Sequence, residues 1–166
     1  MPAADKDIGS AGRFFGETLK YIFTLKEDEE MKPYIHTVQY YETDRMGIAH
    51  HSNYVRWMEE ARVDFLKQAG WGYEKLEREG IASPVTAMEC RYRASTTFPD
   101  EVSVSVAVTE FKGAVLKLKY SMSANGRTVF EGKSEHCFLN GEGKIMRMNR
   151  ERPDFYEAIA SLIEKK

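Results

Sequence analysis

Hydrophobic residues recur at the spacing of an amphipathic helix over residues 52–69. They form one broad stripe made of Tyr54, Trp57, Met58, Ala61, Phe65 and Ala69, widened by Val55, Val63 and Leu66. Ser52 is placed to cap the start of this helix, and Gly70 suits the left-handed residue that follows a helix end. A stripe this wide predicts a long helix that is covered on much of its circumference.

Alternating apolar and polar positions after this helix predict four strands, at residues 84–94, 101–110, 115–122 and 127–139. In the first of them, one face carries Met88, Cys90 and Tyr92, and the other carries Glu89, Arg91 and Arg93. Lys112-Gly113 marks one turn, and Asn125-Gly126 is a strong signal for a two-residue hairpin. A β-rich stretch at 34–41 comes before the helix, residues 72–79 add a short helical piece, and Pro153 opens a last helix.

Short connections between consecutive strands favour antiparallel pairing. The pattern therefore predicts an α+β fold in which a curved antiparallel sheet wraps a long central helix. Residues 34–166 form this domain together with its C-terminal helix. Residues 1–33 form an N-terminal extension, which is either a short helix with a charged linker or an upstream piece without function.

Composition narrows the function classes. The formal net charge of −2 does not favour a nucleic-acid-binding surface. No apolar run reaches the roughly 18 residues that a membrane span needs. Cys90 and Cys137 lack the spacing of a metal site, so we expect buried free thiols and a cytoplasmic location.

The segment at residues 40–62 carries the most chemistry. Asp44 is followed by Gly47, by a polar cluster at residues 50–53 and then by the predicted helix. A carboxylate supplies a base or a nucleophile, and the start of a helix supplies unpaired N–H groups and partial positive charge. Taken alone, Asp44 also suits an ordinary turn. The adjacent His50 and His51 cannot share a helix face, so we expect no metal.

The spacing Tyr40-x-x-x-Asp44-x-x-Gly47-x-x-x-His51-x-x-Tyr54 resembles that of the hotdog-fold acyl-CoA thioesterases. The likeness is strongest to the branch that contains 4-hydroxybenzoyl-CoA thioesterase and the Tol-Pal-associated acyl-CoA thioesterases, and it covers residues 34–145. The resemblance implies hydrolysis of an acyl-CoA to a free acid and coenzyme A. Asp44 would attack the thioester or activate water, and the backbone N–H of His51 would polarise the carbonyl.

The resemblance also implies supporting roles. Gly47 would admit the acyl group without a Cβ clash, and Tyr40 would lie near the catalytic loop. Glu59 matches an acidic helix residue of the same branch. Tyr54 and Trp57 are candidates for substrate contact, although a place in the core suits them better. By chemistry alone, Arg91, Arg93 and Lys112 are candidates for the coenzyme A phosphates, although a solvated outer face of the sheet suits each of them better.

The expected partners are an acyl-CoA substrate and further copies of this chain, as a homodimer or homotetramer with active sites at the interface. No cofactor is expected, because coenzyme A is part of the substrate. Two alternative functions remain open. One is hydrolysis of acyl carrier protein thioesters by the same chemistry, and the other is a non-catalytic acyl-CoA-binding module. Hotdog hydratases differ around the helix start.

Overall fold

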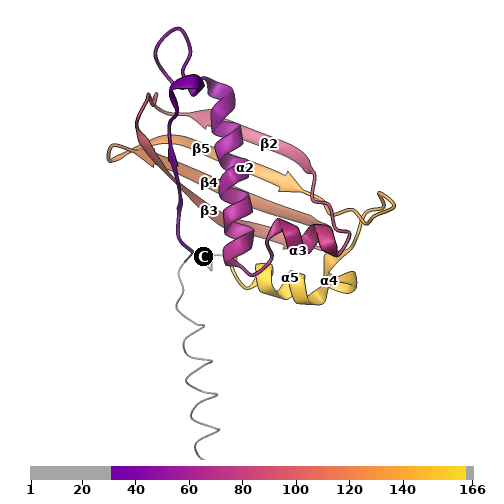
Figure 1. Cartoon of the computed structure of the whole chain (residues 1–166). Helices are drawn as coiled ribbons and strands as arrows, with labels where there is room; N and C mark the ends of the chain where they lie inside the picture. The colour runs from indigo at the N-terminus through magenta and orange to yellow at the C-terminus, as the bar shows by residue number, and fades with distance from the viewer. Residues whose placement is uncertain (1–30, 164–166) are drawn as a thin grey trace, which may run out of the picture. The chain divides into compact units, whose positions relative to one another are not determined.

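A computed structural model describes residues 31–163, so nearly all of the predicted extension lies outside the described residues. One antiparallel sheet with the strand order β1-β3-β4-β5-β2 carries helix α2 across one face (Figure 1). The elements are β1 (Tyr34–Thr37), the 3-10 helix η1 (Tyr40–Glu42), α2 (His51–Gln68), α3 (Tyr73–Arg78), β2 (Val85–Tyr92), β3 (Glu101–Lys112), β4 (Val115–Ala124), β5 (Arg127–His136), α4 (Met148–Glu151) and α5 (Pro153–Ala160). The predicted α+β architecture is confirmed.

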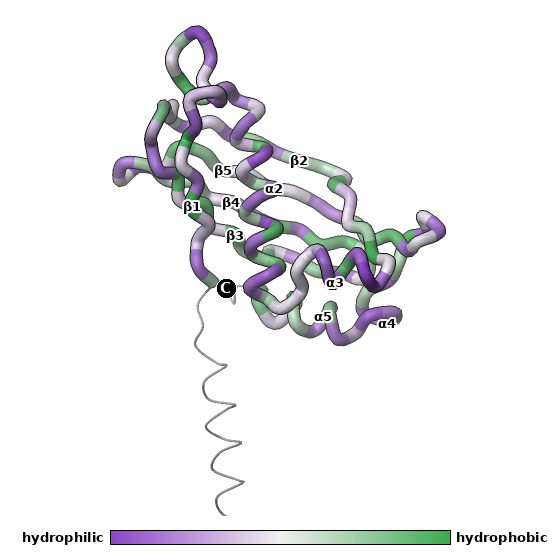
Figure 2. The backbone as a smooth tube through the Cα atoms, in the orientation of Figure 1, coloured by the Kyte–Doolittle hydropathy of each residue, from purple (hydrophilic) through white to green (hydrophobic). Residues whose placement is uncertain are grey.

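Helix α2 follows the predicted hydrophobic stripe, but its cap differs. The N-cap is His50, whose side chain accepts a hydrogen bond from the backbone N–H of Ser52, so the prediction that Ser52 caps the helix was wrong. The imidazole nitrogen replaces the usual hydroxyl or carboxylate oxygen at this position. At the other end Gly70 has φ +78, which confirms it as the left-handed residue after the helix. In Figure 2 hydrophobic and hydrophilic segments alternate along α2, as expected for a helix with one covered side.

The long strands keep the predicted alternation, and their turns follow local chemistry. Asn125 and Gly126 both have positive φ, 52° and 74°, which confirms the two-residue hairpin between β4 and β5. The preceding turn falls at residues 113–114, one position later than predicted. Strand β3 contains a register shift between Val108 and Glu110, and this shift places Phe111 in the core.

Three strands are shorter than their sequence patterns predicted. Strand β2 spans Val85–Tyr92 rather than residues 84–94. Strand β1 ends at Thr37 rather than at residue 41, because the N–H of Gln39 bonds to the carboxylate of Glu42 and starts the turn of η1. Strand β5 ends at His136 rather than at residue 139, and Leu139 makes only isolated bridges to Ala82 and Ile145.

Close contact between α2 and the sheet depends on Gly132. A Cβ at this position would lie 2.7 Å from the ring of Phe130 and 3.0 Å from the sulfur of Met58. The first distance is shorter than real Cβ contacts and the second is tighter than most of them, so a side chain at this position would force Phe130 and Met58 to shift. Glycine lets Met58 on α2 approach β5 without that shift.

Strand β2 forms one edge of the sheet and is exposed along most of its length. Met88, Cys90 and Tyr92 pair with Ser134, Gly132 and Phe130, respectively, so they share the face of the sheet that carries α2, as predicted. They are not buried there, however: 40% of Met88 and 47% of Tyr92 remain accessible. The two free cysteines are half-buried rather than buried. Within residues 31–163 no helix is long and apolar enough to cross a bilayer.

The two ends of α2 have different surroundings. At the C-terminal end, α3 and α5 lie close to the helix (Figure 1). The rings of Trp71, Phe111, Phe138 and Phe155 form a buried aromatic cluster there. At the N-terminal end, only a loop at residues 43–49 leads into the helix. The motif predicted to carry chemistry therefore lies at the end of the helix that the C-terminal helices leave uncovered.

Candidate active site

The loop at residues 43–49 is closed on itself by backbone hydrogen bonds. Thr43 and Ala49 form a β-bridge, the N–H of Asp44 donates to the carbonyl of Ile48 at 2.9 Å, and the N–H of Gly47 donates to the carbonyl of Asp44 at 2.9 Å. Gly47 has φ +75, and no other atom lies within 4 Å of an added Cβ. The backbone conformation of this tight turn is therefore what requires glycine here.

Asp44 is half-buried in this loop, and its two carboxylate oxygens have different surroundings. Oδ1 accepts the backbone N–H of Met46 at 2.8 Å, the contact that defines an Asx turn. Oδ2 has no hydrogen-bond partner among residues 31–163. Asp44 is thus both the turn residue that its sequence context suggested and a carboxylate with one oxygen available for chemistry.

The start of α2 offers a donor. Among the described residues nothing accepts a hydrogen bond from the backbone N–H of His51, the first residue of the helix. The first turn of α2 contains no acidic residue, so no side chain there neutralises the positive end of the helix. Tyr92 on β2 donates its hydroxyl proton to the carbonyl of His51 at 3.1 Å, which ties the helix start to the edge strand.

Glu42 anchors the polypeptide just ahead of this loop. Only 6% of this residue is accessible, and its carboxylate accepts from the N–H of Gln39 at 2.8 Å and from Nε1 of Trp57 at 2.9 Å. Nε2 of His36 lies 2.8 Å from the same carboxylate. The carbonyl of Glu42 accepts from the N–H of His50 and from Nδ2 of Asn53, both at 2.8 Å. One residue therefore joins β1, η1 and α2.

Burial alone would raise the pKa of Glu42, because it disfavours the carboxylate. The hydrogen bonds from Gln39, His36 and Trp57 outweigh burial, and the pKa of Glu42 is lowered. Sequence reasoning missed Glu42. Gln39 and Glu42 form a capping box in the structure, but the sequence signal of this motif begins with Ser or Thr rather than Gln.

A second buried polar group, also missed from the sequence, lies between the middle of α2 and the sheet. Arg62 is 3% accessible; it holds the carboxylate of Glu59 at 2.7 Å and lies 3.1 Å from Nδ1 of His136. Because Arg62 can only donate, Nδ1 of His136 accepts and Nε2 carries the proton that points to Ser134 at 2.7 Å. Burial, with the charge of Arg62, lowers the pKa of His136 to about 3, so this histidine is neutral. Glu59 is thus engaged in an ion pair.

The structure separates the other predicted site residues. Tyr40 is 77% accessible, and its ring packs edge-on against Phe98. Tyr54 and Trp57 are buried in the core, as the periodicity of α2 favoured. Lys112 is exposed at the end of β3 and pairs with Glu110 at 2.6 Å.

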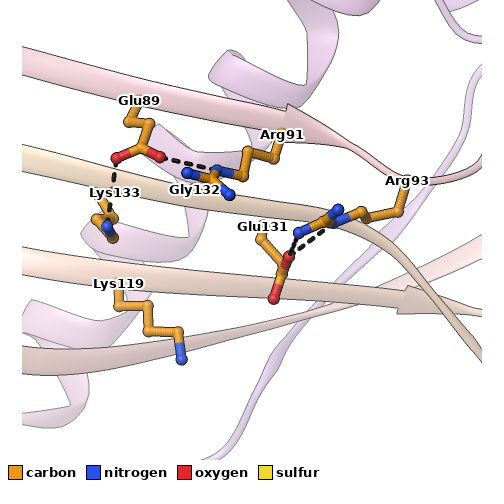
Figure 3. A pocket seen from close by; sticks show the side chains of 7 residues that line it. All are labelled: Glu89, Arg91, Arg93, Lys119, Glu131, Gly132 and Lys133. Carbon is orange, nitrogen blue, oxygen red and sulfur yellow. Dashed lines mark hydrogen bonds and ion pairs between the residues drawn. The ribbon is translucent and has the colours of Figure 1, made fainter.

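Arg91 lies on the outer face of the sheet, opposite α2, where side chains surround a pocket of about 240 Å³ (Figure 3). The lining residues are Glu89, Arg91, Arg93, Lys119, Glu131, Gly132 and Lys133. Glu89 pairs with Arg91 and Lys133, and Glu131 pairs with Arg93. Neither Asp44 nor His51 lines this pocket. Of the three predicted phosphate-binding cations, Arg91 and Arg93 line it and Lys112 does not.

The adjacent histidines do not belong to a metal cluster in this part of the chain. The rings of His50 and His51 lie 4.1 Å apart, and Nδ1 of His50 is taken up by Ser52 at 2.9 Å. Among residues 31–163, no three His, Cys, Asp or Glu side chains are grouped closely enough to hold a metal ion.

Comparison with known proteins shows which superfamily this chain belongs to. The model of the thioesterase-like superfamily matches residues 38–162. The chain therefore belongs to this superfamily and is a thioester hydrolase, and the predicted hotdog fold is confirmed.

Particular relatives are similar over most of their length. A putative esterase of Aquifex aeolicus is 32% identical over 118 residues, which are 71% of this chain and 91% of the relative. The putative acyl-CoA thioesterase YneP of Bacillus subtilis is 28% identical over 73% of this chain and 89% of its own length. The solved structure of a DHNA-CoA thioesterase from Staphylococcus aureus is 31% identical, with a TM-score of 0.75 over 78% of this chain and 89% of that one.

The buried carboxylate of Glu42 makes a testable contribution to stability. Replacing Glu42 with Gln removes the charge that its three donors satisfy, and we expect the free energy of unfolding at neutral pH to fall by about 1–3 kcal/mol. Because the pKa of Glu42 is lowered in the folded protein, its contribution is present above the ordinary value of 4.5 and is lost as the pH falls through the lower folded value. The difference between wild type and E42Q should therefore shrink from roughly pH 6 to pH 3 in urea denaturation. The exposed Glu142→Gln is the control, and a difference that does not change with pH would contradict this assignment.

Proposed function

We propose that this protein hydrolyses acyl-CoA thioesters to a free carboxylic acid and coenzyme A, with Asp44 as the reacting carboxylate and the backbone N–H of His51 as the donor to the thioester oxygen. One observation carries the proposal. Among residues 31–163, Oδ2 of the Asp44 carboxylate and the N–H at the start of α2 have no hydrogen-bond partner, and one tight loop at residues 43–49 joins the two groups. Acyl transfer needs both groups, one to supply electrons and one to take up the charge that develops on oxygen.

Two routes use the same geometry. In the first, Oδ2 of Asp44 bonds to the carbonyl carbon, the thiolate of coenzyme A leaves, and water then hydrolyses the resulting mixed anhydride. In the second, Asp44 takes a proton from a water molecule whose oxygen attacks the carbonyl carbon, and the thiolate leaves when the tetrahedral intermediate collapses. In both routes the carbonyl oxygen becomes negative before the carbon–sulfur bond breaks, and the N–H of His51 stabilises that charge.

The relatives support coenzyme A as the carrier of the acyl group. YneP is described as a putative acyl-CoA thioesterase, and the staphylococcal structure is that of a DHNA-CoA thioesterase. The phosphates of coenzyme A require cations, and both Arg91 and Lys112 have exposed side chains. The two lie apart, so we expect at most one of them to contact the nucleotide of a given coenzyme A molecule.

We also propose that two copies of the chain pair through β2. This strand bonds to β5 on one side, and within residues 31–163 no strand pairs with its other edge. Open edges invite pairing, and the side of β2 that faces α2 carries the exposed apolar side chains of Met88 and Tyr92. Because Tyr92 also bonds to His51, a partner on this edge would lie beside the start of α2.

The first test removes the charge of Asp44 and keeps its shape. The asparagine side chain of Asp44→Asn can neither attack as a carboxylate nor accept a proton. We therefore expect kcat to fall at least about a hundredfold, which is the lower end of the contribution that a general base makes, while the fold stays intact. Release of thiol from acyl-CoAs ranging from acetyl to palmitoyl, with a benzoyl ester included, measures the loss. Cys90→Ser and Cys137→Ser are the controls and should retain hydrolysis. Activity of the Asn variant within a few-fold of wild type would remove Asp44 from the mechanism, and tight binding without turnover in wild type would favour a non-catalytic module.

The second test removes one backbone donor. Proline lacks an N–H and is well tolerated at the first position of a helix, where His51 lies. His50 has φ −63 and ψ 137, a conformation that suits the residue before a proline. We therefore expect His51→Pro to fold and to lose about a hundredfold in kcat. His51→Ala keeps the N–H and should remain at least about tenfold more active than the proline variant. Equal activity of the two variants would exclude this N–H as the donor.

The third test concerns the proposed dimer. A lysine in place of Met88 puts a charge on the exposed side of the β2 edge, so we expect the chain to sediment as a monomer where wild type sediments as a dimer. Ile35→Lys is the matched control, because Ile35 is an exposed apolar residue on β1, the opposite edge strand. A monomeric wild type, or a dimer that Met88→Lys leaves unchanged, would contradict pairing through β2.

A further inference from the structure

The loop that carries Asp44 has few connections to the rest of the domain. Within residues 44–48 the backbone hydrogen bonds join Asp44 to Ile48 and Gly47 to Asp44, so they hold the shape of the loop but not its position. At the base of the loop, the N–H of Ala49 donates to the carbonyl of Thr96 at 2.8 Å. No ion pair of residues 31–163 involves Asp44 or its neighbour Arg45.

One hydrogen bond reaches the tip of this loop from another part of the described chain. The hydroxyl of Thr97 donates to the carbonyl of Gly47 at 2.6 Å. Thr97 lies in the connection between β2 and β3, far from Gly47 in sequence. The bond therefore fixes the position of the loop relative to the sheet, which the loop's own hydrogen bonds cannot do.

Thr97 is itself held firmly enough to act as an anchor. Its N–H donates to Oδ2 of Asp100 at 2.9 Å, and its carbonyl accepts from the N–H of Asp100 at 2.7 Å. Oδ1 of Asp100 accepts from Nδ2 of Asn125, in the hairpin between β4 and β5, at 3.0 Å. The carbonyl of Asp100 accepts from the N–H of Val38 at 2.9 Å. A chain of hydrogen bonds thus runs from the sheet to the loop through Thr97.

We propose that Thr97 is a positioning residue for hydrolysis: its hydroxyl holds the carbonyl of Gly47 and thereby fixes the place of the Asp44 carboxylate relative to the start of α2. The inference rests on the proposed role of Asp44. In this role Thr97 acts through the loop, because its hydroxyl bonds to the carbonyl of Gly47 and not to Asp44 itself. A displacement of about 1 Å in a reacting group is enough to cost up to a hundredfold in rate.

The experiment compares two substitutions at Thr97 with the same change elsewhere. Thr97→Val keeps the branched shape and removes the donor, so we expect kcat to fall about tenfold or more while KM for the same acyl-CoA changes less than about twofold. Thr97→Ser restores the hydroxyl and should recover most of the lost kcat. Thr109→Val is the control, because Thr109 is also exposed and also donates to a backbone carbonyl, that of Lys117 at 3.1 Å. It should leave kcat unchanged.

A second readout does not depend on turnover. Hydrogen exchange of the amides of Asp44 and Gly47 should become faster in Thr97→Val and return toward the wild-type rate in Thr97→Ser, while amides in the middle of α2 stay unchanged. Unchanged exchange in the Val variant, or faster exchange with an unchanged kcat, would overturn the positioning role. Absence of turnover in wild type would overturn the proposed function instead, and hydrogen exchange would still show whether Thr97 holds the loop.

Discussion

The buried carboxylate of Glu42 is the contact on which the arrangement of this domain depends. A charge with so little access to water is costly unless donors replace the lost hydration, and Gln39, His36 and Trp57 supply them. These donors come from β1, the start of η1 and the middle of α2. Satisfying one carboxylate therefore fixes three segments relative to one another, and the loop at residues 43–49 begins directly after it.

This anchoring explains why the chemistry gathers at one end of α2. The helix is the core element of the domain, and its C-terminal end is surrounded by the aromatic residues of the C-terminal region. At its N-terminal end, a loop presents Asp44, and the N–H of His51 has no acceptor in the part of the chain that the structure describes. Hydrogen bonds to the carbonyls of Glu42 and Thr96 give this end a defined geometry.

The two faces of the sheet and its edge strand β2 have different roles in the domain. Its inner face supports α2, and Gly132 lets the helix approach. Its edge strand β2 carries Tyr92, which links an open edge to the start of the helix. Its outer face carries ion pairs around the pocket of Figure 3, and these pairs are well explained by solvation of an exposed face.

The sequence by itself determined the parts of the structure that depend on neighbours along the chain. The spacing of Trp57, Ala61 and Phe65 predicted α2, and Asn125-Gly126 predicted a hairpin, because periodicity and turn conformation are local properties. The motif around Asp44 placed a carboxylate ahead of a helix for the same reason.

Only the tertiary structure decided which polar groups meet. Neither the pairing of Arg62 with His136 nor that of Thr97 with Gly47 has a local signature, because each joins segments that lie far apart in sequence. Likewise, the alternation of apolar and polar residues predicted the two faces of β2. The exposure of this strand depends instead on its place at the edge of the sheet. Such contacts form when folding brings distant donors and acceptors out of water together, and no pattern in a single stretch of sequence records that.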